Sequence, residues 1–200
     1  STIVMNGSSA QNITNTTSSN ILFHSLNCSN AAGVSLSAPS TGRFTIKNTL
    51  TVSSGTLNAG SNIFTMLSDA TSTAVIGNST GAINGSMILQ RYIQAGVYRK
   101  YDLGSTVTST TIDDWDNELF MSIGATDDGS TPAYLGGDGS AGGTNSVFIY
   151  NNQLNSSKKY VAVTTGTTLT PGRGYQTLIA DDLTGFPGRA IDSRGTPNMG

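Results

Sequence analysis

The 200-residue sequence is poor in charge, and its few charges are unevenly placed. Charged residues make up 11% of the chain, against about 25% in an average soluble domain. Residues 1–68 contain Arg43 and Lys47 but no Asp or Glu, so all twelve acidic residues come later. Paired carboxylates for acid–base catalysis on sugars are therefore missing from this part of the chain. The chain also lacks the basic patch of a nucleic-acid-binding protein, so no nucleic-acid partner is expected.

Cysteine and histidine are equally scarce. Cys28 is the only cysteine, so no disulfide can form within the chain, and its alternation with Leu26 predicts a small buried core residue. His24 is the only histidine, which leaves a zinc cluster or a Ser-His-Asp triad without partners. The sequence has no run of about 18 apolar residues, so no membrane span is expected.

Helix signals are nearly missing as well. The most helix-like segment is TIDDWDNELFMSI, residues 111–123, in which Asp113 or Asp114 can cap one or two turns. Elsewhere apolar residues alternate with small polar ones, and Gly, Ser and Asn separate the alternating runs. This pattern is typical of short strands joined by turns, and it predicts an all-β protein.

The first half contains a weak internal repeat. The segment SLNCSNAAGVSL, residues 25–36, aligns with TLTVSSGTLNA, residues 49–59. The alignment superposes three pairs of residues, with one small insertion before the last pair: Leu26 on Leu50, Cys28 on Val52 and Gly33 on Gly55. A period in the low twenties fits one coil of a parallel β-solenoid, in which inward side chains stack as apolar columns. An antiparallel sandwich shows similar alternation and is the alternative.

The composition changes near residue 88. Six of the seven tyrosines lie at or after Tyr98, and a long Gly-rich segment, residues 125–145, separates apolar strands. This second part resembles a β-sandwich with a long decorated loop. We therefore expect a parallel β-helix-like segment over residues 1–88 and a β-sandwich-like module over residues 89–200.

The C-terminal residues are expected to form an unfinished sheet edge. The segment AIDSRGTPNMG, residues 190–200, reads as a strand followed by turn residues. Residues 187–200 contain only three charges that could protect such an edge: Arg189, Asp192 and Arg194. We expect the second module to be truncated here, with this segment pairing with chain beyond residue 200 or with another molecule.

Several segments occur in an order that is similar to a known family. They are ILFHSLNCSNAAGVSLS, LTVSSGTLNAGSNIFTMLSDATSTAVIG, GSMILQRYI, a Trp after TID, SVFIYNNQ and GRGYQTLI. Together they resemble the recurring region of very long Bacteroidetes cell-surface proteins, which are exported by type IX secretion and described as adhesin-like. The resemblance covers roughly residues 21–180. It implies a β-helical stretch and a β-sandwich-like module outside the cell, within a far longer polypeptide, and it carries over no catalytic residues.

Two features of that family are missing. After RYI the sequence reads YRKYDLGSTV, without the Ser-Ser-Pro that usually ends the next strand. The C-terminal sorting domain of exported proteins is also missing, so the export route is an inference about the parent protein.

Two groups of acidic residues are candidate sites. Asp127, Asp128 and Asp138 lie in the Gly-rich segment, and calcium sites are often built from Asp carboxylates and loop carbonyls. Their spacing matches no EF-hand or nonapeptide repeat, so a mobile surface loop is the alternative, and no other cofactor is expected. The segment DDWDNE, residues 113–118, concentrates four acids, two of which could flank a sugar. We favour a solvated turn with capping Asp residues around a buried Trp115.

Aromatic residues are the candidates for glycan contact. Tyr134, inside the Gly-rich segment, is the best candidate for an exposed ring. Tyr150, after SVFI, and Tyr175, after GRG, are expected to be core or corner residues, because most aromatics in a sandwich are buried with a polar tip reaching outward.

These observations predict a non-catalytic structural and adhesive segment of a large extracellular bacterial surface protein. Its expected partners are neighbouring domains of the same polypeptide and, at the cell surface, glycans or other surface proteins. The first alternative is a carbohydrate-binding module attached to a secreted polysaccharide-degrading enzyme. The second, an enzyme in its own right, requires a carboxylate pair in a cleft.

Overall fold

The computed structural model describes residues 1–39, 42–94, 99–116, 147–151, 160–164, 166–179 and 188–198. These residues are mostly β-strands and turns, with one short helix, α1 (Ile112–Asp116), and the predicted all-β class is confirmed. The described part has no helix long and apolar enough to cross a membrane. The chain divides into two compact units: unit 1 consists of Ser1–Tyr92 and Asp192–Gly200, and unit 2 of Ile93–Ile191.

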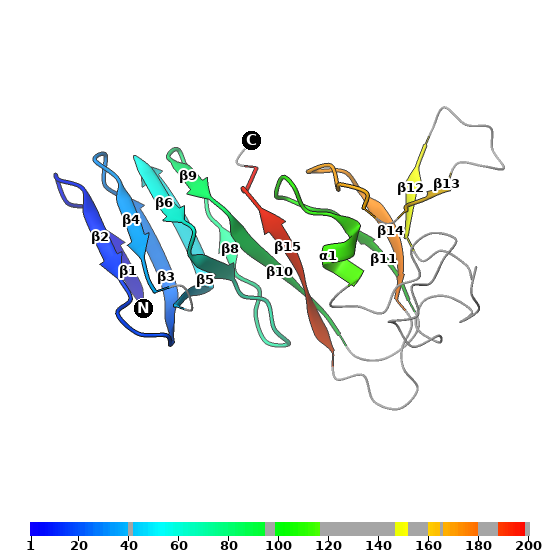
Figure 1. Cartoon of the computed structure of the whole chain (residues 1–200), viewed down its shortest axis with the longest axis horizontal. Helices are drawn as coiled ribbons and strands as arrows, with labels where there is room; N and C mark the ends of the chain where they lie inside the picture. The colour runs from blue at the N-terminus through cyan, green and yellow to red at the C-terminus, as the bar shows by residue number, and fades with distance from the viewer. Residues whose placement is uncertain are drawn as a thin grey trace. The chain divides into compact units, whose positions relative to one another are not determined.

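Unit 1 contains a β-solenoid of about four turns, built from two sheets. One sheet has the order β1 (Thr2–Met5), β3 (Asn20–Ser29), β5 (Arg43–Ser54), β7 (Ile63–Met66), β10 (Met87–Ile93) and β15 (Arg189–Gly195), and β8 (Val75–Ile76) also pairs with β5. The other has the order β2 (Gln11–Thr14), β4 (Val34–Ser37), β6 (Thr56–Gly60) and β9 (Ala82–Gly85). From β1 to β10 the strands pair in parallel, and Figure 1 shows successive coils side by side.

The predicted register of the inner columns is confirmed. Leu26 lies opposite Leu50, and Cys28 lies opposite Val52. All four side chains are at most 1% exposed. Because each coil places its inward apolar residues over those of the previous coil, apolar area is buried at every turn of the solenoid.

The corners between the two sheets are held by side-chain amides and by glycine backbone. Asn30 is buried, and its Nδ2 donates to the Ser9 carbonyl at 2.7 Å and to Gln11 Oε1 at 2.9 Å. Gly55 has a φ of +70°, and a Cβ atom there would collide with the carbonyl oxygen of Asn30. Only glycine fits at this corner, because it alone combines a positive φ with such a close backbone approach.

The predicted superposition of Gly33 on Gly55 is wrong by one residue. Val34 pairs with Leu57, which places Gly33 beside Thr56, the neighbour of Gly55. The ladder between β3 and β5 has an irregularity just after Cys28, where one strand gains a residue on the other. The offset between paired residues therefore changes along the coil, from 24 at Leu26–Leu50 to 23 at Val34–Leu57.

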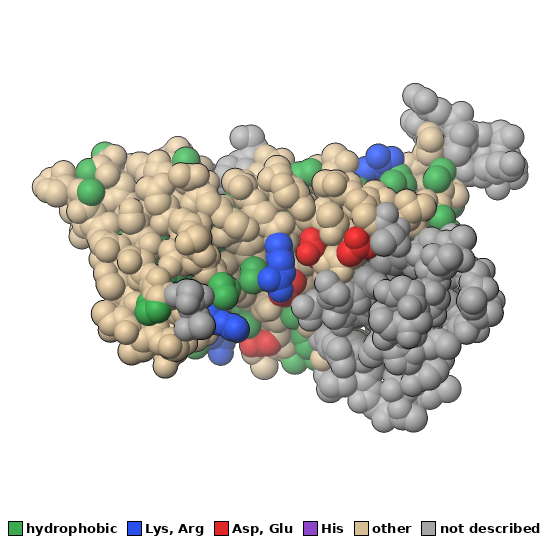
Figure 2. All heavy atoms as spheres, viewed as in Figure 1, with side chains coloured by type: hydrophobic (Ala, Val, Ile, Leu, Met, Phe, Trp, Pro, Cys, Tyr) green, Lys and Arg blue, Asp and Glu red, His purple; other side chains and the backbone are tan. Residues whose placement is uncertain are grey.

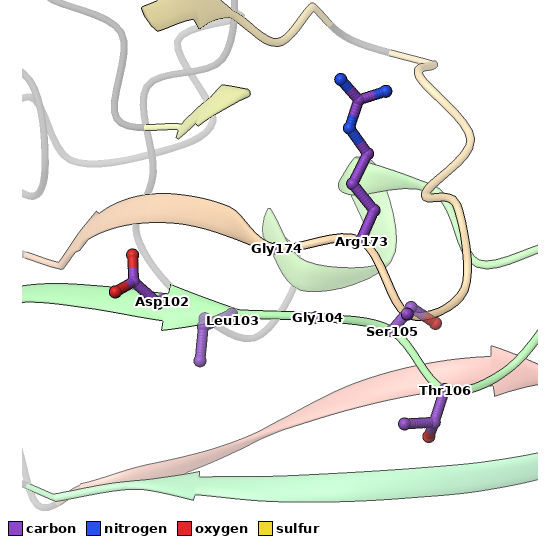
Figure 3. Close-up of a pocket in the computed structure, with 8 residues that line it drawn as sticks. Asp102, Leu103, Gly104, Ser105, Thr106, Arg173 and Gly174 are labelled. Carbon is purple, nitrogen blue, oxygen red and sulfur yellow. The ribbon is translucent and has the colours of Figure 1, made fainter. Parts of the chain in front are cut away.

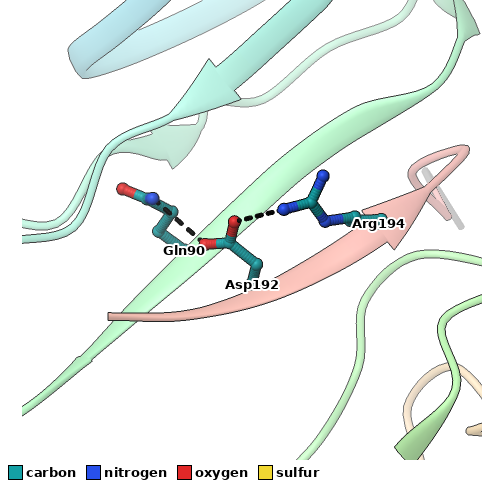
Figure 4. Close-up of polar contacts among 3 residues, drawn as sticks. All are labelled: Gln90, Asp192 and Arg194. Carbon is teal, nitrogen blue, oxygen red and sulfur yellow. Dashed lines mark hydrogen bonds and ion pairs between the residues drawn. The ribbon is translucent and has the colours of Figure 1, made fainter. Parts of the chain in front are cut away.

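β15 finds its strand partner within the chain. It pairs with β10, and residues from Asp192 onward belong to unit 1 rather than to the second part of the chain. Gln90 Nε2 donates to Asp192 Oδ1 at 3.0 Å, and Arg194 Nη2 contacts Asp192 Oδ2 at 3.1 Å (Figure 4). Gln90 Oε1 also accepts a hydrogen bond from the Ser68 backbone at 3.3 Å. The segment expected to seek a partner elsewhere is thus tied into the last strands of the solenoid sheet.

Unit 2 contains a four-stranded antiparallel sheet with the order β11 (Arg99–Leu103), β14 (Tyr175–Ile179), β12 (Val147–Tyr150) and β13 (Tyr160–Ala162). Trp115 of α1 and Tyr175 of β14 lie in its core, with ring centroids 6.0 Å apart and an angle of 85° between the rings. Among the described residues of this unit, the sheet and α1 are the regular elements. The predicted β-sandwich is not confirmed.

Candidate functional site

The residues proposed for calcium and glycan binding lie outside the described part of the chain: Asp127, Asp128, Asp138 and Tyr134. Within the described ranges, no group of three or more His, Cys, Asp or Glu side chains is placed to hold a metal ion. The candidates that can be examined are the acids of α1, the aromatics of unit 2, a pocket in unit 2 and the outer face of the solenoid.

Asp113 and Asp114 of α1 bind backbone amides. Asp114 Oδ2 accepts a hydrogen bond from the Thr111 backbone N–H at 2.8 Å, which is one of the two hydrogen bonds of a capping box at the start of the helix. Asp113 Oδ2 accepts from the Gly166 N–H at 2.9 Å and so fastens a neighbouring loop to the helix. Trp115, between these acids and the rest of the segment, is buried. The predicted capping role is confirmed for Asp114 but not for Asp113, and the predicted burial of Trp115 is confirmed.

The two tyrosines expected in the core have different environments. Tyr175 is buried, and its hydroxyl accepts a hydrogen bond from the Thr170 N–H at 2.8 Å, so the prediction of a core or corner residue is confirmed. The prediction for Tyr150 is wrong, because this residue is 50% exposed. It is the last residue of β12, where the strand leaves the core, and alternation within the strand does not predict burial there.

Tyr150 forms an exposed aromatic pair with Tyr160. The two residues lie opposite each other on β12 and β13, with ring centroids 5.5 Å apart and an angle of 66° between the rings. Tyr160 is 53% exposed, and Val161 beside it is also exposed. β13 is the outer strand of its sheet. The pair offers apolar ring surface with polar hydroxyl tips, a combination that suits contact with a partly apolar, hydroxyl-rich ligand.

Sequence reasoning missed Tyr160 as a surface residue. The signal that could have located it is the polar run NNQLNSSKK, residues 151–159, which separates it from Tyr150. A polar run between two short apolar strands indicates a hairpin connection, and residues that flank such a connection lie opposite each other on the paired strands.

Unit 2 also contains a small pocket of about 210 Å³, lined by residues 102–106 and 172–174. Asp102 and Arg173 are its two charged lining residues, and Figure 3 shows their side chains on adjoining segments of the lining. Ser105 is engaged within the wall, since its Oγ donates to the Val107 carbonyl at 2.9 Å. With one carboxylate and a volume below the roughly 300–1,000 Å³ of usual ligand sites, the pocket suits only a small polar group and supplies no acid–base pair.

The outer face of the four-stranded solenoid sheet carries amide and hydroxyl side chains in register. Asn12, Ser35, Asn58 and Asn84 occupy equivalent positions on β2, β4, β6 and β9. Asn84 Nδ2 donates to Asn58 Oδ1 at 3.0 Å, so the ladder is partly hydrogen-bonded along the stack. Figure 2 shows how few charged side chains appear on the visible face of unit 1. The outer face of the four-stranded sheet therefore offers a ligand many neutral hydrogen-bonding groups at regular spacing, and it attracts charged ligands little.

Cys28, the one thiol of the chain, lies in the solenoid core. Burial raises the pKa of this thiol to about 11, and at neutral pH the reactive thiolate is therefore scarce. Its predicted role as a small core residue is confirmed.

Comparison of the chain with protein-family models, curated proteins and solved structures finds no match. The functional interpretation of the candidate sites is therefore based on their geometry alone.

Proposed function

We propose that this chain is a non-catalytic structural and adhesive segment of a large extracellular bacterial surface protein. The observation that carries the proposal is the solenoid itself, a regular stack of coils whose first 68 residues contain no carboxylate. Such a stack extends by about 4.8 Å with each coil and presents the same kind of side chain at each step. These properties suit a spacer with a repetitive contact surface.

The chemistry of the outer face supports the same function. A neutral ladder such as Asn12, Ser35, Asn58 and Asn84 makes hydrogen bonds that salt screens little, whereas contacts between exposed charges weaken as ionic strength rises. The proposed partners are neighbouring domains of the same long polypeptide, and glycans or proteins at a cell surface. The resemblance to type IX-exported surface proteins supports the extracellular setting.

The test is a pair of assays on the purified chain. We expect it to bind intact bacterial or host cells with an affinity that changes little between low and high salt. We also expect no release of reducing ends or unsaturated sugars from a panel of polysaccharides. Turnover that is abolished by Asp113→Asn or Asp114→Asn would overturn the non-catalytic part, and failure to bind any cell surface would contradict the adhesive part.

A second candidate function, a carbohydrate-binding module of a secreted polysaccharide-degrading enzyme, is favoured by the Tyr150–Tyr160 pair. A glycan array separates the two proposals, because a module of this kind should select one class of polysaccharide. Tyr150→Ala and Tyr160→Ala should then each weaken binding by about tenfold, in line with the ~1–1.4 kcal/mol of one ring contact. Leu22→Ala is the matched control, since Leu22 is an exposed apolar residue of unit 1. An array with no selective signal would count against this second function.

A further inference from the structure

One end of the antiparallel sheet in unit 2 brings the exposed tyrosine pair close to the pocket. Tyr175 of β14 lies opposite Ile149 of β12 on one side and Leu103 of β11 on the other. At this end of the sheet the next residues on β12, β14 and β11 are, in that order, Tyr150, Gly174 and Gly104. Both glycines line the pocket. The tyrosine pair and the pocket are therefore neighbours on one sheet.

The tyrosine pair and the charged groups of the pocket share the outer face of this sheet. Leu103 is buried in the core of unit 2, and Ile149 packs against that core. Because side chains alternate between the two faces of a strand, Asp102 and Tyr150 belong to the opposite, outer face. Figure 3 shows the side chains of Asp102 and Arg173 directed to one side of the ribbon and that of Leu103 to the other. Ring surface and charge are thus offered to the same ligand.

Glycine keeps the pocket open. A Cβ atom at Gly174 would have no heavy atom of a described residue within 4 Å, so a side chain there would extend into open space. Gly104 and Gly172 also line the pocket, whose volume is about 210 Å³. This volume is below that of usual ligand sites, and it suits the hydroxyl-bearing edge of one sugar ring rather than a whole ligand.

Two exposed groups of opposite charge line the pocket, the carboxylate of Asp102 and the guanidinium of Arg173. Within the described ranges, neither group takes part in an ion pair or a side-chain hydrogen bond. A carboxylate accepts hydrogen bonds and a guanidinium donates them, so a hydroxyl-rich ligand can satisfy both. An anionic ligand attracted by Arg173 would be repelled by Asp102, and the pair therefore favours a neutral ligand.

The tyrosine rings form an angled wall rather than a flat platform. The planes of Tyr150 and Tyr160 differ by 66°. A flat crystalline polysaccharide needs coplanar rings beneath it, whereas angled rings can contact one sugar ring at the end of a chain. The apolar C–H face of such a sugar matches the apolar ring surface, while its hydroxyls remain available to polar groups.

We propose that this end of the sheet binds the terminal sugar of a neutral, soluble oligosaccharide. The sugar ring contacts Tyr150 and Tyr160, and its hydroxyls enter the pocket towards Asp102 and Arg173. The inference rests on the glycan binding proposed above, and it adds the location of the site and the class of glycan. It does not involve the amide ladder of unit 1.

NMR titration of the isotope-labelled chain tests the proposal. The probes are neutral oligosaccharides of glucose, mannose, galactose, xylose and N-acetylglucosamine, with uronic-acid oligosaccharides for comparison. Microcrystalline cellulose is tested separately by pull-down. At least one neutral oligosaccharide should shift the amide signals of Tyr150, Gly104 and Gly174 together. The signals of β4 and β6 in unit 1 should not move.

Three substitutions locate the site. Arg173→Gln and Asp102→Asn should each weaken binding of that oligosaccharide by about tenfold, because hydrogen bonds to charged groups are stronger than those to neutral ones. Gly174→Ala should weaken it severalfold and leave the melting temperature unchanged, since the added methyl group extends into open space. Arg43→Gln is the matched control for Arg173→Gln, because Arg43 is an exposed arginine of the solenoid. This control should bind like the wild type.

Several results would overturn the inference. They are no binding of any neutral oligosaccharide at millimolar concentration, preferential binding of uronic-acid oligosaccharides or crystalline cellulose, and binding that neither Arg173→Gln nor Asp102→Asn weakens. If the wild-type chain still binds cells in any of these cases, the adhesive function stands without this site. A chain that binds neither cells nor any oligosaccharide would refute both proposals.

Discussion

The coils of the solenoid in unit 1 and the strand pair β11–β14 in unit 2 bring together residues of very different sequence separation. In unit 1 a residue packs on its equivalent one coil away, as Leu26 does on Leu50. In unit 2 the strand pair β11–β14 places Leu103 opposite Tyr175, so a loop of about 70 residues must close before the pair can form. Pairing between residues close in sequence costs less chain entropy and forms faster than pairing between distant residues. The comparison predicts that the two units respond separately to core substitutions.

Trp115→Ala should have the largest effect and should be confined to unit 2. Trp115 is buried and packs edge-on against Tyr175, so its truncation should lower the free energy of unfolding of unit 2 by about 3–5 kcal/mol. Hydrogen exchange resolved by segment would measure this loss in β11, β12 and β14. Trp115→Phe should cost less. Equal loss of protection in β3 and β5 would show that the units unfold together, against the comparison.

Leu50→Ala should destabilise unit 1 and leave unit 2 unchanged. Leu50 is buried in the middle coil, and its loss should lower the free energy of unfolding of unit 1 by about 2–5 kcal/mol through lost apolar burial and a cavity. Urea unfolding followed by segment-resolved exchange would detect the change in β3 and β5. The control Leu22→Ala should change stability little, because Leu22 is 56% exposed. A Leu50 variant as stable as the wild type would disprove the column arrangement.

Tyr175→Phe should have a smaller effect, again within unit 2. The substitution keeps the ring beside Trp115 but removes the hydroxyl that accepts the Thr170 N–H. One unsatisfied, partly buried donor should lower the free energy of unfolding by about 1 kcal/mol. Tyr160→Phe, on an exposed ring, is the matched control and should be neutral in thermal melts. If both variants melt at the wild-type temperature, the corner hydrogen bond contributes nothing.

Cys28→Ala should change stability least of these substitutions at neutral pH, but it should alter how stability depends on pH in alkaline solution. Its folded-state pKa of about 11 lies above the ordinary thiol value of 9.0, because burial disfavours the thiolate. The unfolded chain therefore ionises first, and stability should fall as pH rises from about 9 towards 11. Cys28→Ala should remove this part of the pH dependence. Native thiol labelling should be slow at pH 7, and rapid labelling without unfolding would contradict the buried position.

The strand register and burial of unit 1 are easier to predict from the sequence than those of unit 2. Alternating residues such as Leu26 and Cys28 recur at a fixed distance, so the pattern alone predicts both strand register and burial. The predicted pairing is wrong at the corner near Gly33, because the offset falls by one residue between Cys28 and Val34 and not by two, a difference that leaves the apolar columns undisturbed. Local pattern has little power at corners, where single backbone hydrogen bonds and positive φ angles decide the register.

The candidate sites were harder to predict. The exposure of Tyr150 depends on where β12 ends, which the alternation of its residues does not reveal.

The pairing of β10 with β15 depends on contacts such as Gln90 with Asp192, which are 102 residues apart. No local periodicity in the sequence signals a contact of that range. The capping role of Asp114 is predictable, because a helix start is specified by its own neighbouring residues, whereas the contact of Asp113 with Gly166 spans 53 residues and has no local signal.

The return of β15 to β10 has a mechanical consequence. Unit 2, Ile93–Ile191, is inserted between two strands that pair with each other in unit 1. A tensile load applied across residues 1–198 passes from β10 to β15 through their ladder, and the inserted unit carries no tension while that ladder holds. Rupture of the ladder would transfer the load to unit 2 and release roughly 100 residues of extra length, at most about 3.5 Å each. The hydrogen bond between Gln90 and Asp192 lies within the ladder that shields unit 2 from the load.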